Sequence, residues 1–478
     1  MTVMVWFKRD LRVYDNPALT EAMKEGPVIA VYVLSHEQWD KHDVSPAQRA
    51  LIVGQLHSLE KKLAELNVPL LVKVGDCFDS VPGTLARLIK EYSVTSLYFN
   101  REYEVNERRC ESAVEQSVKL LGAEVFAFHD ACMVVPGSVL SLKGEPYKVF
   151  SAFKKAFIAG YGFKARPVAY FPGSQPVIDV SSDLTELQCI GYDSEWLQQW
   201  PAGEAEAHDR LERFMDVASR DYKATRDIPG VPGTSQLSPY LAVGALSTTQ
   251  CMTTALMANE GLLDGGNEGI ACWINELIWR EFYRHVLFHN PEVSMNQPLK
   301  KETDLLPWRN DQADFQRWCD GNTGFPIIDA AMKQLVTTGW MHNRLRMITA
   351  MFLTKNLFID WRLGEQFFMR HLVDGDLASN NGGWQWCAST GVDAAPYFRI
   401  FNPVSQSKRF DPDGTFIRKF LPQLASLNAK DIHQPSLAQA KKLNYPEPMV
   451  NLSESAGRTK LLFKNLTQPT VPDEVRVG

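Results

Sequence analysis

The segment Val28-Ile-Ala-Val-Tyr-Val-Leu34 is a continuous apolar run, which is typical of a strand buried on both faces in a parallel sheet. Helical patterns separate this run from four other predicted strands, and the longest of these patterns spans Pro46 to Asn67. The four strands are Val3 to Phe7, Pro69 to Val74, Thr95 to Phe99 and Glu124 to Phe128. Such alternation predicts that residues 1–130 form an α/β domain with a Rossmann-like parallel sheet and helices on both faces.

The carboxyl end of the first predicted strand lacks the glycine fingerprint of dinucleotide-binding domains. The chain continues there as Lys8-Arg9-Asp10-Leu11-Arg12, without a Gly-x-Gly-x-x-Gly motif. A ligand can still bind at the carboxyl ends of the strands, because open parallel sheets hold ligands at that edge.

The remaining sequence divides into a connector and a helical domain. Residues 131–204 are rich in proline and glycine and predict a long interdomain connector with one short helix, Lys148 to Ile158. Residues 205–478 have a helical pattern and predict an all-α domain, although its polar, proline-spaced end, 434–478, is expected to be a poorly packed tail. The predicted helices are Ala205 to Arg220, Ser247 to Asn259, Gly269 to His289, Asp311 to Asp320, Ile327 to Thr338, His342 to Asn356 and Trp361 to Leu372.

Composition agrees with a two-domain globular protein. The 478 residues exceed the size of a single core, and hydrophobic residues make up 45% of the chain. The sequence shows no long apolar run and no leader segment, so we expect a soluble, cytoplasmic protein. Its eight cysteines form no Cys-x-x-Cys pair, and His285 and His289 lack the adjacent Glu and a third ligand of a zinc site. We therefore expect no metal.

The charge is uneven along the chain. The net charge is -6, but residues 339–420 contain ten Lys/Arg against seven Asp/Glu, a balance of +3 that leaves -9 for the rest. Within this region Ala395 to Phe410 interleaves aromatic and basic side chains. This pattern indicates a surface for an anionic polymer, although a solvated face has a similar composition.

The most unusual stretch is Asp374-Gly-Asp-Leu-Ala-Ser-Asn-Asn-Gly-Gly-Trp-Gln-Trp386. It combines two acids, two asparagines, three glycines and two tryptophans in thirteen residues. This composition suits a backbone that closes around a flat, polar-edged ligand better than a helix that packs on its neighbours. Eight of the twelve tryptophans fall within the 114 residues that end at Trp386, so indole rings have a particular use in this region.

Three further stretches are candidates for binding. Residues 230–239 form a Gly/Pro turn followed by hydroxyls, which can hold a phosphate or simply cap a helix. Residues 273–284 place Trp273, Glu276, Trp279, Arg280 and Tyr283 on one broad helix face, which indicates either a pocket wall or an exposed Glu276–Arg280 pair. In residues 340–347 the side chains of Asn343 and Met347 share a face, Arg346 can pair with Asp374, and Arg344 can reach a phosphate.

With these residues the chain resembles the cryptochrome/photolyase family, and within it the bacterial, folate-using class I cyclobutane pyrimidine dimer photolyases. The resemblance runs nearly end to end and is carried by Trp6 to Arg12, Thr234 to Pro239, Trp273 to Tyr283, Asp374 to Trp386 and Asp393 to Pro403. It implies an α/β antenna domain, a long connector and a helical domain that binds FAD, which is FADH⁻ in the active state.

The resemblance also implies roles for single residues near the flavin. The implied flavin contacts are Tyr222, Thr234, Ser235, Gln236, Leu237, Ser238, Trp273, Arg280, Arg346, Asp374, Asp376 and Asn380. The Gly/Pro turn and hydroxyls of residues 230–239, which we call the hydroxyl loop, would hold the diphosphate. Asn380 would lie against flavin N5, where a neutral amide suits the reduced anionic flavin. Light-driven reduction of the flavin is implied to use three indoles, Trp384, Trp361 and Trp308.

The implied substrate is a pyrimidine dimer flipped out of DNA. Excited FADH⁻ gives it an electron, the cyclobutane ring splits, and the electron returns to the flavin. Trp279 and Trp386 would grip the dimer, while Glu276 and Asn343 would bond to its base edges. The full implied set of substrate and DNA contacts is Glu276, Trp279, Arg280, Asn343, Arg344, Met347, Trp386, Arg399 and Gln406.

The antenna pigment implied by the resemblance is 5,10-methenyltetrahydrofolate. His42, Asn106 and Glu107 match the pterin site of the folate-using members. However, residues 291–298 contain Ser294 and Met295 where some relatives have a Cys and a Lys. A deazaflavin is therefore the alternative pigment.

Other functions are compatible with the same fold. A cryptochrome would signal without repair, a (6-4) photolyase would have paired histidines where this chain has Met341-His342, and a helical DNA-binding protein would lack flavin. Asn380, the complete set of dimer contacts and the absence of a long C-terminal extension favour a dimer photolyase. We expect it to act on DNA as a monomer and not to associate with a membrane.

Overall fold

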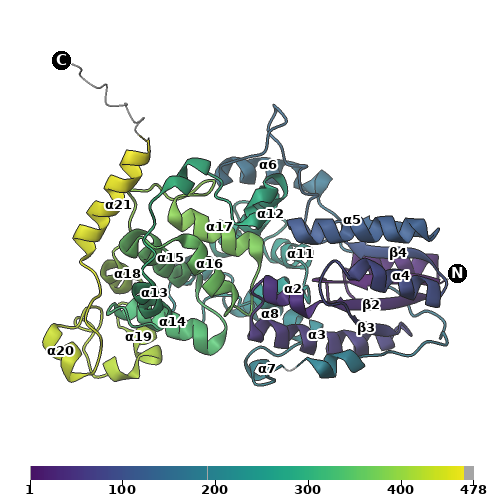
Figure 1. The fold of residues 1–478 in the computed structure, drawn as a ribbon, viewed down its shortest axis with the longest axis horizontal. Helices are drawn as coiled ribbons and strands as arrows, with labels where there is room; N and C mark the ends of the chain where they lie inside the picture. Colours follow the sequence, from purple (N-terminus) through teal and green to yellow (C-terminus); the bar gives the residue numbers. More distant parts are fainter. Residues whose placement is uncertain (1, 191, 468–478) are drawn as a thin grey trace, which may run out of the picture.

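The computed structural model describes residues 2–190 and 192–467, which form an α/β domain joined to a larger helical domain (Figure 1). The α/β domain contains a five-stranded, fully parallel sheet in the order β3-β2-β1-β4-β5. The strands are β1 Thr2–Phe7, β2 Val28–Leu34, β3 Leu70–Val74, β4 Val94–Asn100 and β5 Glu124–Phe128. All five predicted strands are confirmed, and no bound differs by more than one residue.

Side chains of β1 alternate between two apolar layers, because successive strand residues point to opposite faces. Val3 and Val5 lie in the core that includes Leu19 and Leu51, whereas Met4 lies in a separate core beneath the helices on the other face. Helices therefore cover both faces, as predicted. The helices of this domain are α1 Pro17–Glu25, α2 His36–Lys41, α3 Pro46–Ala64, α4 Val81–Glu91 and α5 Val105–Leu120.

The strand order reverses at β1, which lies between β2 and β4. The register sets Val5 beside Ala30 of β2 and Tyr98 of β4. In open parallel sheets this reversal opens a crevice at the carboxyl ends of the strands. Lys8 and Arg9 follow β1 directly and therefore lie at the mouth of that crevice.

The connector is more ordered than predicted. It contains α6 Phe150–Lys164, which begins two residues later and ends six residues later than the predicted helix, and the short helices η1 Thr185–Cys189 and α7 Trp196–Gln199. Gln175 ties the connector to the sheet, because its side-chain amide exchanges hydrogen bonds of 2.7 and 3.0 Å with the backbone of Val28.

All regular elements after residue 203 in the described chain are helical. The α-helices are α8 Glu204–Val217, α9 Tyr222–Thr225, α10 Ser238–Val243, α11 Thr248–Ala258, α12 Glu268–His289, α13 Gln312–Cys319, α14 Pro326–Thr338, α15 Asn343–Met351, α16 Trp361–Met369, α17 Leu377–Ala388, α18 Pro403–Phe410, α19 Thr415–Phe420, α20 Leu437–Lys442 and α21 Leu452–Thr467. Three short 3₁₀ helices, η2 Pro291–Met295, η3 Lys301–Leu305 and η5 Pro422–Leu424, and a π-helical segment, η4 Phe352–Leu357, complete the domain.

The structure corrects three predictions in this domain. Asp374 to Trp386 is not irregular, because Asp376 caps α17 by accepting the N–H of Ser379 at 2.9 Å. The predicted helix from His342 to Asn356 is divided into α15 and the π-helical η4.

The predicted loose tail is also wrong for residues 434–467. They contain α20 and α21, and Phe463 of α21 is buried, with its ring stacked on Tyr397 at 5.6 Å. Residues 468–478 lie outside the described chain.

Candidate functional site

Three helices that pack together carry most of the predicted flavin and dimer residues. α17 contacts both α12 and α15 (Figure 1). α17 and α12 approach closely at Gly382, where a Cβ would lie 2.3 Å from a ring carbon of Tyr283. Gly382 therefore sets the spacing of the two helices, whereas a Cβ at Gly383 would meet no atom of the described chain within 4 Å.

Asp376 is the charged centre of this assembly. Its carboxylate lies 2.5 Å from Arg284 and 3.4 Å from Arg280, both on α12. Burial alone would raise the pKa of Asp376, but the two guanidiniums hold that pKa well below its usual range. The structure thus brings the predicted flavin residues Arg280 and Asp376 together, and adds Arg284.

The predicted pair of Arg346 and Asp374 is confirmed. One guanidinium nitrogen of Arg346 lies 3.0 and 2.8 Å from the two carboxylate oxygens of Asp374. Nearby, the amide of Asn380 is oriented by α16, because its Nδ2 donates to the backbone carbonyl of Glu365 at 3.1 Å. The Glu365 carboxyl accepts from Asn381 at 3.0 Å, and burial raises its pKa to about 7.

The hydroxyl loop has free donors at the start of α10. Within the described chain, the backbone N–H groups of residues 234–237 and the hydroxyls of Thr234 and Ser235 make no hydrogen bond. Gln236 has a left-handed φ of 51°, and Gly233 is pressed against Thr225, where a Cβ would lie 2.6 Å from it. Unpaired N–H and O–H groups beside a helix start are suited to an anion such as a diphosphate.

The other predicted flavin contacts in and near this loop have partners within the described chain. Leu237 lies in the main core. Tyr222 and Trp273 both pack on Phe214, with ring centroids 5.7 and 5.1 Å away. The hydroxyl of Ser238 accepts the indole N–H of Trp340 at 3.4 Å.

Glu276 does not pair with Arg280, which was the alternative interpretation of that helix face. Its carboxylate instead binds Arg226, outside α12. Burial raises the pKa of Glu276, and the Arg226 guanidinium opposes that shift. Arg344 is likewise paired, at 2.8 Å from Asp227, and its guanidinium lies over the ring of Phe410.

The dimer contacts predicted on α15 and α17 lie near the surface. Asn343 is exposed, and Met347 and Trp386 are half-buried and pack against the core of the helical domain. Of the predicted strand contacts, Arg399 is exposed before α18 and Gln406 is half-buried within it. Their contact with DNA stays a prediction.

The three indoles predicted to conduct electrons lie on α17, on α16 and in the segment before α13. Trp384 lies against Gly364 of α16, where a Cβ would be 2.2 Å from the ring. Trp361 lies three residues before Gly364 on α16 and is buried. Trp308 packs on Phe358 at 4.8 Å and is partly exposed. We call Trp384, Trp361 and Trp308 the tryptophan chain.

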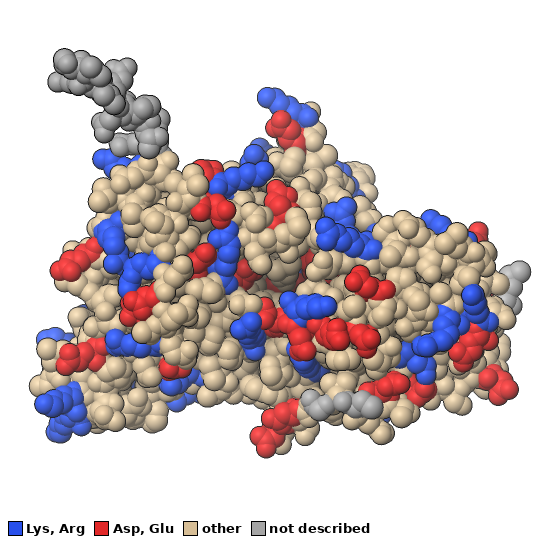
Figure 2. Space-filling view, in the orientation of Figure 1, with Lys and Arg blue, Asp and Glu red and all other residues tan. Residues whose placement is uncertain are grey.

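The positive balance of residues 339–420 does not form a uniform basic face. Several of its cations are paired or buried, since Arg370 binds Asp43 and Lys355 is fully buried. Figure 2 shows acidic and basic side chains intermixed over the visible face. Within the described chain the exposed cations of this region without a carboxylate partner are Arg399, Lys408, Arg409 and Lys419.

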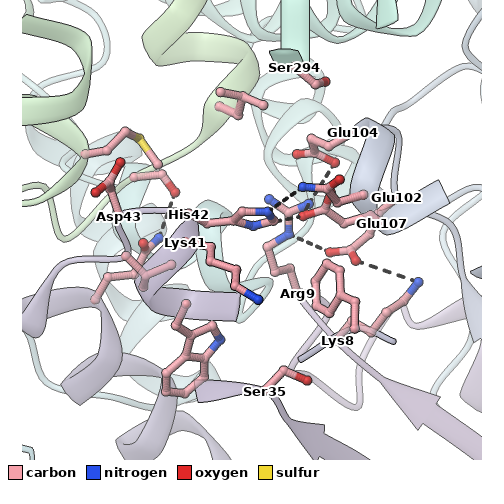
Figure 3. Close-up of a pocket in the computed structure, with 18 of the residues that line it drawn as sticks. Lys8, Arg9, Ser35, Lys41, His42, Asp43, Glu102, Glu104, Glu107 and Ser294 are labelled. Atoms are coloured by element: carbon pink, nitrogen blue, oxygen red, sulfur yellow. Dashed lines mark hydrogen bonds and ion pairs between the residues drawn. The ribbon is translucent and has the colours of Figure 1, made fainter. Parts of the chain in front are cut away.

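A cavity of about 520 Å³ lies between the two domains, at the strand ends where a ligand was predicted. Trp6 and His42 line it from the α/β domain, and Glu365 and Leu377 line it from the helical domain. Figure 3 shows His42 turned toward Arg9 and the carboxylates of Glu102, Glu104 and Glu107. We call this space the interdomain cavity.

The three predicted antenna residues meet at this cavity. Nδ1 of His42 lies 3.5 Å from the Glu107 carboxylate, and Nε2 of His42 lies 3.0 Å from the Asn106 amide. Burial and then Glu104 raise the pKa of Glu107 to about 8, while burial and Arg9 lower the pKa of His42. An amide, a neutral imidazole and a carboxyl can recognise the polar edge of a heterocycle.

Sequence reasoning did not identify Arg226, Arg284 and Glu365. Arg284 carries a weak local signal, since it is four residues from Arg280 and thus on the same helix face. Arg226 and Glu365 carry none, because each is recognised only by a partner distant in sequence.

Fold and site together define a two-domain flavoprotein with a ligand cavity at its α/β sheet. A family model described as DNA photolyase matches residues 3–169, and one described as FAD binding domain of DNA photolyase matches residues 273–465. The chain therefore belongs to the DNA photolyase family and binds FAD.

Two solved structures and one curated relative illustrate the similarity. The deoxyribodipyrimidine photo-lyase of Vibrio cholerae is 44% identical over 472 residues, covering 96% of this chain and 99% of that protein. A bacterial class III photolyase from Agrobacterium tumefaciens superposes with a TM-score of 0.86 at 34% identity, over 97% of both chains. A Synechocystis cryptochrome gives a TM-score of 0.85 at 29% identity, covering 96% of this chain and 99% of its own.

Within residues 2–190 and 192–467, no helix has the length and apolar character needed to cross a bilayer. No group of His, Cys, Asp and Glu side chains in these ranges is arranged to hold a metal ion.

Proposed function

We propose that the protein is a deoxyribodipyrimidine photo-lyase, which splits cyclobutane pyrimidine dimers in DNA in a light-driven reaction. The observation that carries this proposal is the arrangement of α12. Within about one turn, the helix carries Arg280, which pairs with Asp376, and also Glu276 and Trp279, which are predicted to bind the dimer. Groups for a cofactor and for a substrate are thus adjacent on one rigid element.

The alternative, a cryptochrome without repair activity, has less support. The fold does not separate the two, because a photolyase and a cryptochrome superpose about equally well. The distinction comes from single residues. The five side chains predicted to contact the dimer are carried by α12, α15 and α17, and the residue predicted to lie beside flavin N5 is Asn380, a neutral amide. The Vibrio cholerae and Escherichia coli relatives, which are covered over nearly their whole length, are named deoxyribodipyrimidine photo-lyase.

The residues of the helical domain fit FAD. The unpaired donors of residues 234–237 would bind its diphosphate, and the ion pairs of Asp374 and Asp376 would fix charged groups beside its ring. Reduced FAD, when bound, supplies on illumination the electron that opens the cyclobutane ring and accepts it back afterwards. Asn380, oriented by Glu365, would offer N5 an uncharged partner.

The dimer would be held by two indoles and two polar groups. Trp279 and Trp386 would contact its apolar faces, Glu276 and Asn343 would bond to its base edges, and Met347 would fill the space between them. Arg280, Arg344, Arg399 and Gln406 would contact the DNA strand. Arg344 would have to exchange Asp227 for a phosphate to do so.

For the antenna we propose 5,10-methenyltetrahydrofolate in the interdomain cavity, with a deazaflavin as the alternative. His42, Asn106 and Glu107 line the cavity as the folate interpretation requires. Lys41 also lines it, and its ammonium reaches into the same space without a carboxylate partner in the described chain (Figure 3). Lys41 could therefore supply the cation that residues 291–298 lack.

The remaining proposals concern organisation. We propose a cytoplasmic monomer without a metal that acts on dimer-containing DNA. We propose residues 1–130 as the antenna domain, 131–204 as the connector and 205–478 as the catalytic domain. These bounds are supported by β5, which ends at Phe128, and by α8, which begins at Glu204.

A repair assay tests the proposed function. The FAD-loaded protein is incubated with ultraviolet-irradiated oligothymidine, either in the dark or under near-ultraviolet or blue light. We expect the dimers to disappear only in the light and in proportion to exposure. Dimers that persist under light with fully reduced flavin would favour the cryptochrome function.

Glu276 gives a sharper test of the dimer site. We expect Glu276→Ala to raise the Kd for dimer-containing DNA about tenfold or more, because a hydrogen bond to a charged group contributes about 1.5–3 kcal/mol. The repair quantum yield should also fall while FAD stays bound. Glu268→Ala, an exposed change on the same helix, is the matched control. Unchanged repair by Glu276→Ala at saturating dimer would contradict the assigned role.

A further inference from the structure

Phe150, the first residue of α6, covers one face of Trp279. The two ring centroids are 3.6 Å apart and the ring planes differ by 7°, so the rings overlap face to face. No other aromatic pair of the described residues is as close. A residue of the connector is therefore in direct contact with a tryptophan of the predicted dimer site.

Phe150 is itself held by the helical domain. Its backbone N–H donates to Oδ2 of Asp393 at 3.1 Å. The residue that precedes α6, Val149, supplies no side-chain cap, so the Asp393 carboxylate satisfies a free N–H at the helix start. Asp393 has a left-handed φ of 46°, a conformation that residues other than glycine keep only where their surroundings hold them in it.

The other rings around Trp279 cannot replace this contact. Among the described residues they are Phe282 at 5.8 Å and Tyr283 at 5.6 Å, and both belong to α12 itself. Neighbours on the same helix move with Trp279, and their ring planes are inclined to the indole by 76° and 32°, so neither lies flat on it. Phe150 is the aromatic contact from outside α12, and it is the one that lies flat on the indole.

We propose that Phe150 is a positioning residue for lesion binding, which holds the Trp279 ring in the plane that receives the dimer, and that Asp393 holds Phe150 in place. This inference rests on the proposed function. Asp393 belongs to the same loop as Arg399, the exposed predicted strand contact. One carboxylate thus joins a segment that would bind a phosphate to the indole that would grip the lesion.

Dark binding measurements test the proposal. The FAD-loaded protein is titrated with one oligonucleotide carrying a thymine dimer and with the same oligonucleotide undamaged. We expect Phe150→Ala to raise the Kd for the dimer about threefold to tenfold, the range that an aromatic pair supports, and to leave the Kd for undamaged DNA unchanged. Asp393→Ala should act in the same direction, and Phe150→Tyr should restore the wild-type value. Phe163→Ala, an exposed change on the same helix, is the control.

A double-mutant cycle separates positioning from general damage to the fold. In a Trp279→Ala background, Phe150→Ala should cause no further loss, because its effect is exerted through the indole. FAD content and the thermal midpoint of each variant verify folding, and Phe150→Leu replaces Phe150→Ala if the latter fails to load FAD.

Two outcomes would overturn the positioning role of Phe150, and a third would overturn the proposed function of the protein. Unchanged or tighter dimer binding by the Phe150 variants, or additive losses in the cycle, would show that Phe150 does not position Trp279. A wild-type protein that repairs no dimer under light would refute the proposed function. A wild-type protein that repairs dimers while the Phe150 variants bind them normally would refute only the positioning role.

Discussion

Replacing Trp308 with Phe is expected to reduce light-driven reduction of oxidised FAD to the level of a dark control, while repair by chemically reduced protein stays unchanged. Both results are expected if electrons pass along the proposed tryptophan chain. The ring of Trp384, on α17, lies against Gly364 of α16. Trp361 is the first residue of α16, and Trp308 packs on Phe358 just before that helix. Of the three, Trp308 is partly exposed and can accept electrons from an external donor. Phe keeps the packing but is a far weaker electron donor than an indole.

Trp318 offers a matched comparison for this experiment. Its ring lies 6.1 Å from Trp384, but it is fully buried and so has no exposed end. We expect Trp318→Phe to photoreduce normally once its FAD content is corrected for. The measurement is the loss of oxidised-flavin absorbance under blue light with an external reductant. If Trp318→Phe blocked reduction and Trp308→Phe did not, the electron route would pass through Trp318.

The α/β domain was predictable because its signals are local. Strand β2 is buried at every position, so its sequence is apolar without interruption and its bounds are read directly. The functional helices were predictable for a related reason, since α12 interrupts an apolar pattern with charged residues on one face. A charge on such a face indicates a specific partner, and the structure shows ion pairs with Arg226 and Asp376.

Helix α17 could not be predicted from local patterns. Asn and Gly have low helix propensities, and Gly382 and Gly383 are adjacent. The helix forms because Asp376 caps its start and because Gly382 packs against Tyr283, 99 residues earlier in the sequence. Tertiary contacts of this kind leave no periodic signal.

The partners of the charged residues were equally hidden. Arg226 and Glu276 are 50 residues apart, and Arg284 and Asp376 are 92 apart. A sequence shows which charges exist but not which of them meet after folding. This explains why the Glu276–Arg280 alternative, which is local, was conceivable from the sequence and is nevertheless wrong.

Replacing Asp376 with Asn is expected to lower the free energy of unfolding by about 3–5 kcal/mol, the usual cost of removing one partner from a buried ion pair. Asn can still accept the Ser379 N–H, so the cap of α17 is kept and only the charge is lost. The guanidiniums of Arg280 and Arg284 would then remain buried without a counter-charge. The urea midpoint should fall at an unchanged slope, and less FAD should copurify.

The pH dependence and a second substitution identify the cause. Because the folded-state pKa of Asp376 lies below its unfolded value, its contribution is complete above the unfolded pKa and is lost only as the pH falls toward the folded pKa. The gap between wild type and Asp376→Asn should therefore be constant from about pH 8 to pH 5 and narrow only in stronger acid. Asp264→Asn, which breaks an exposed pair with Lys154, should show no gap. Adding Arg284→Met to Asp376→Asn should recover part of the lost stability, because it removes one buried charge that has no counter-charge. If the double variant recovers no stability, the uncompensated guanidiniums are not the cause of the loss.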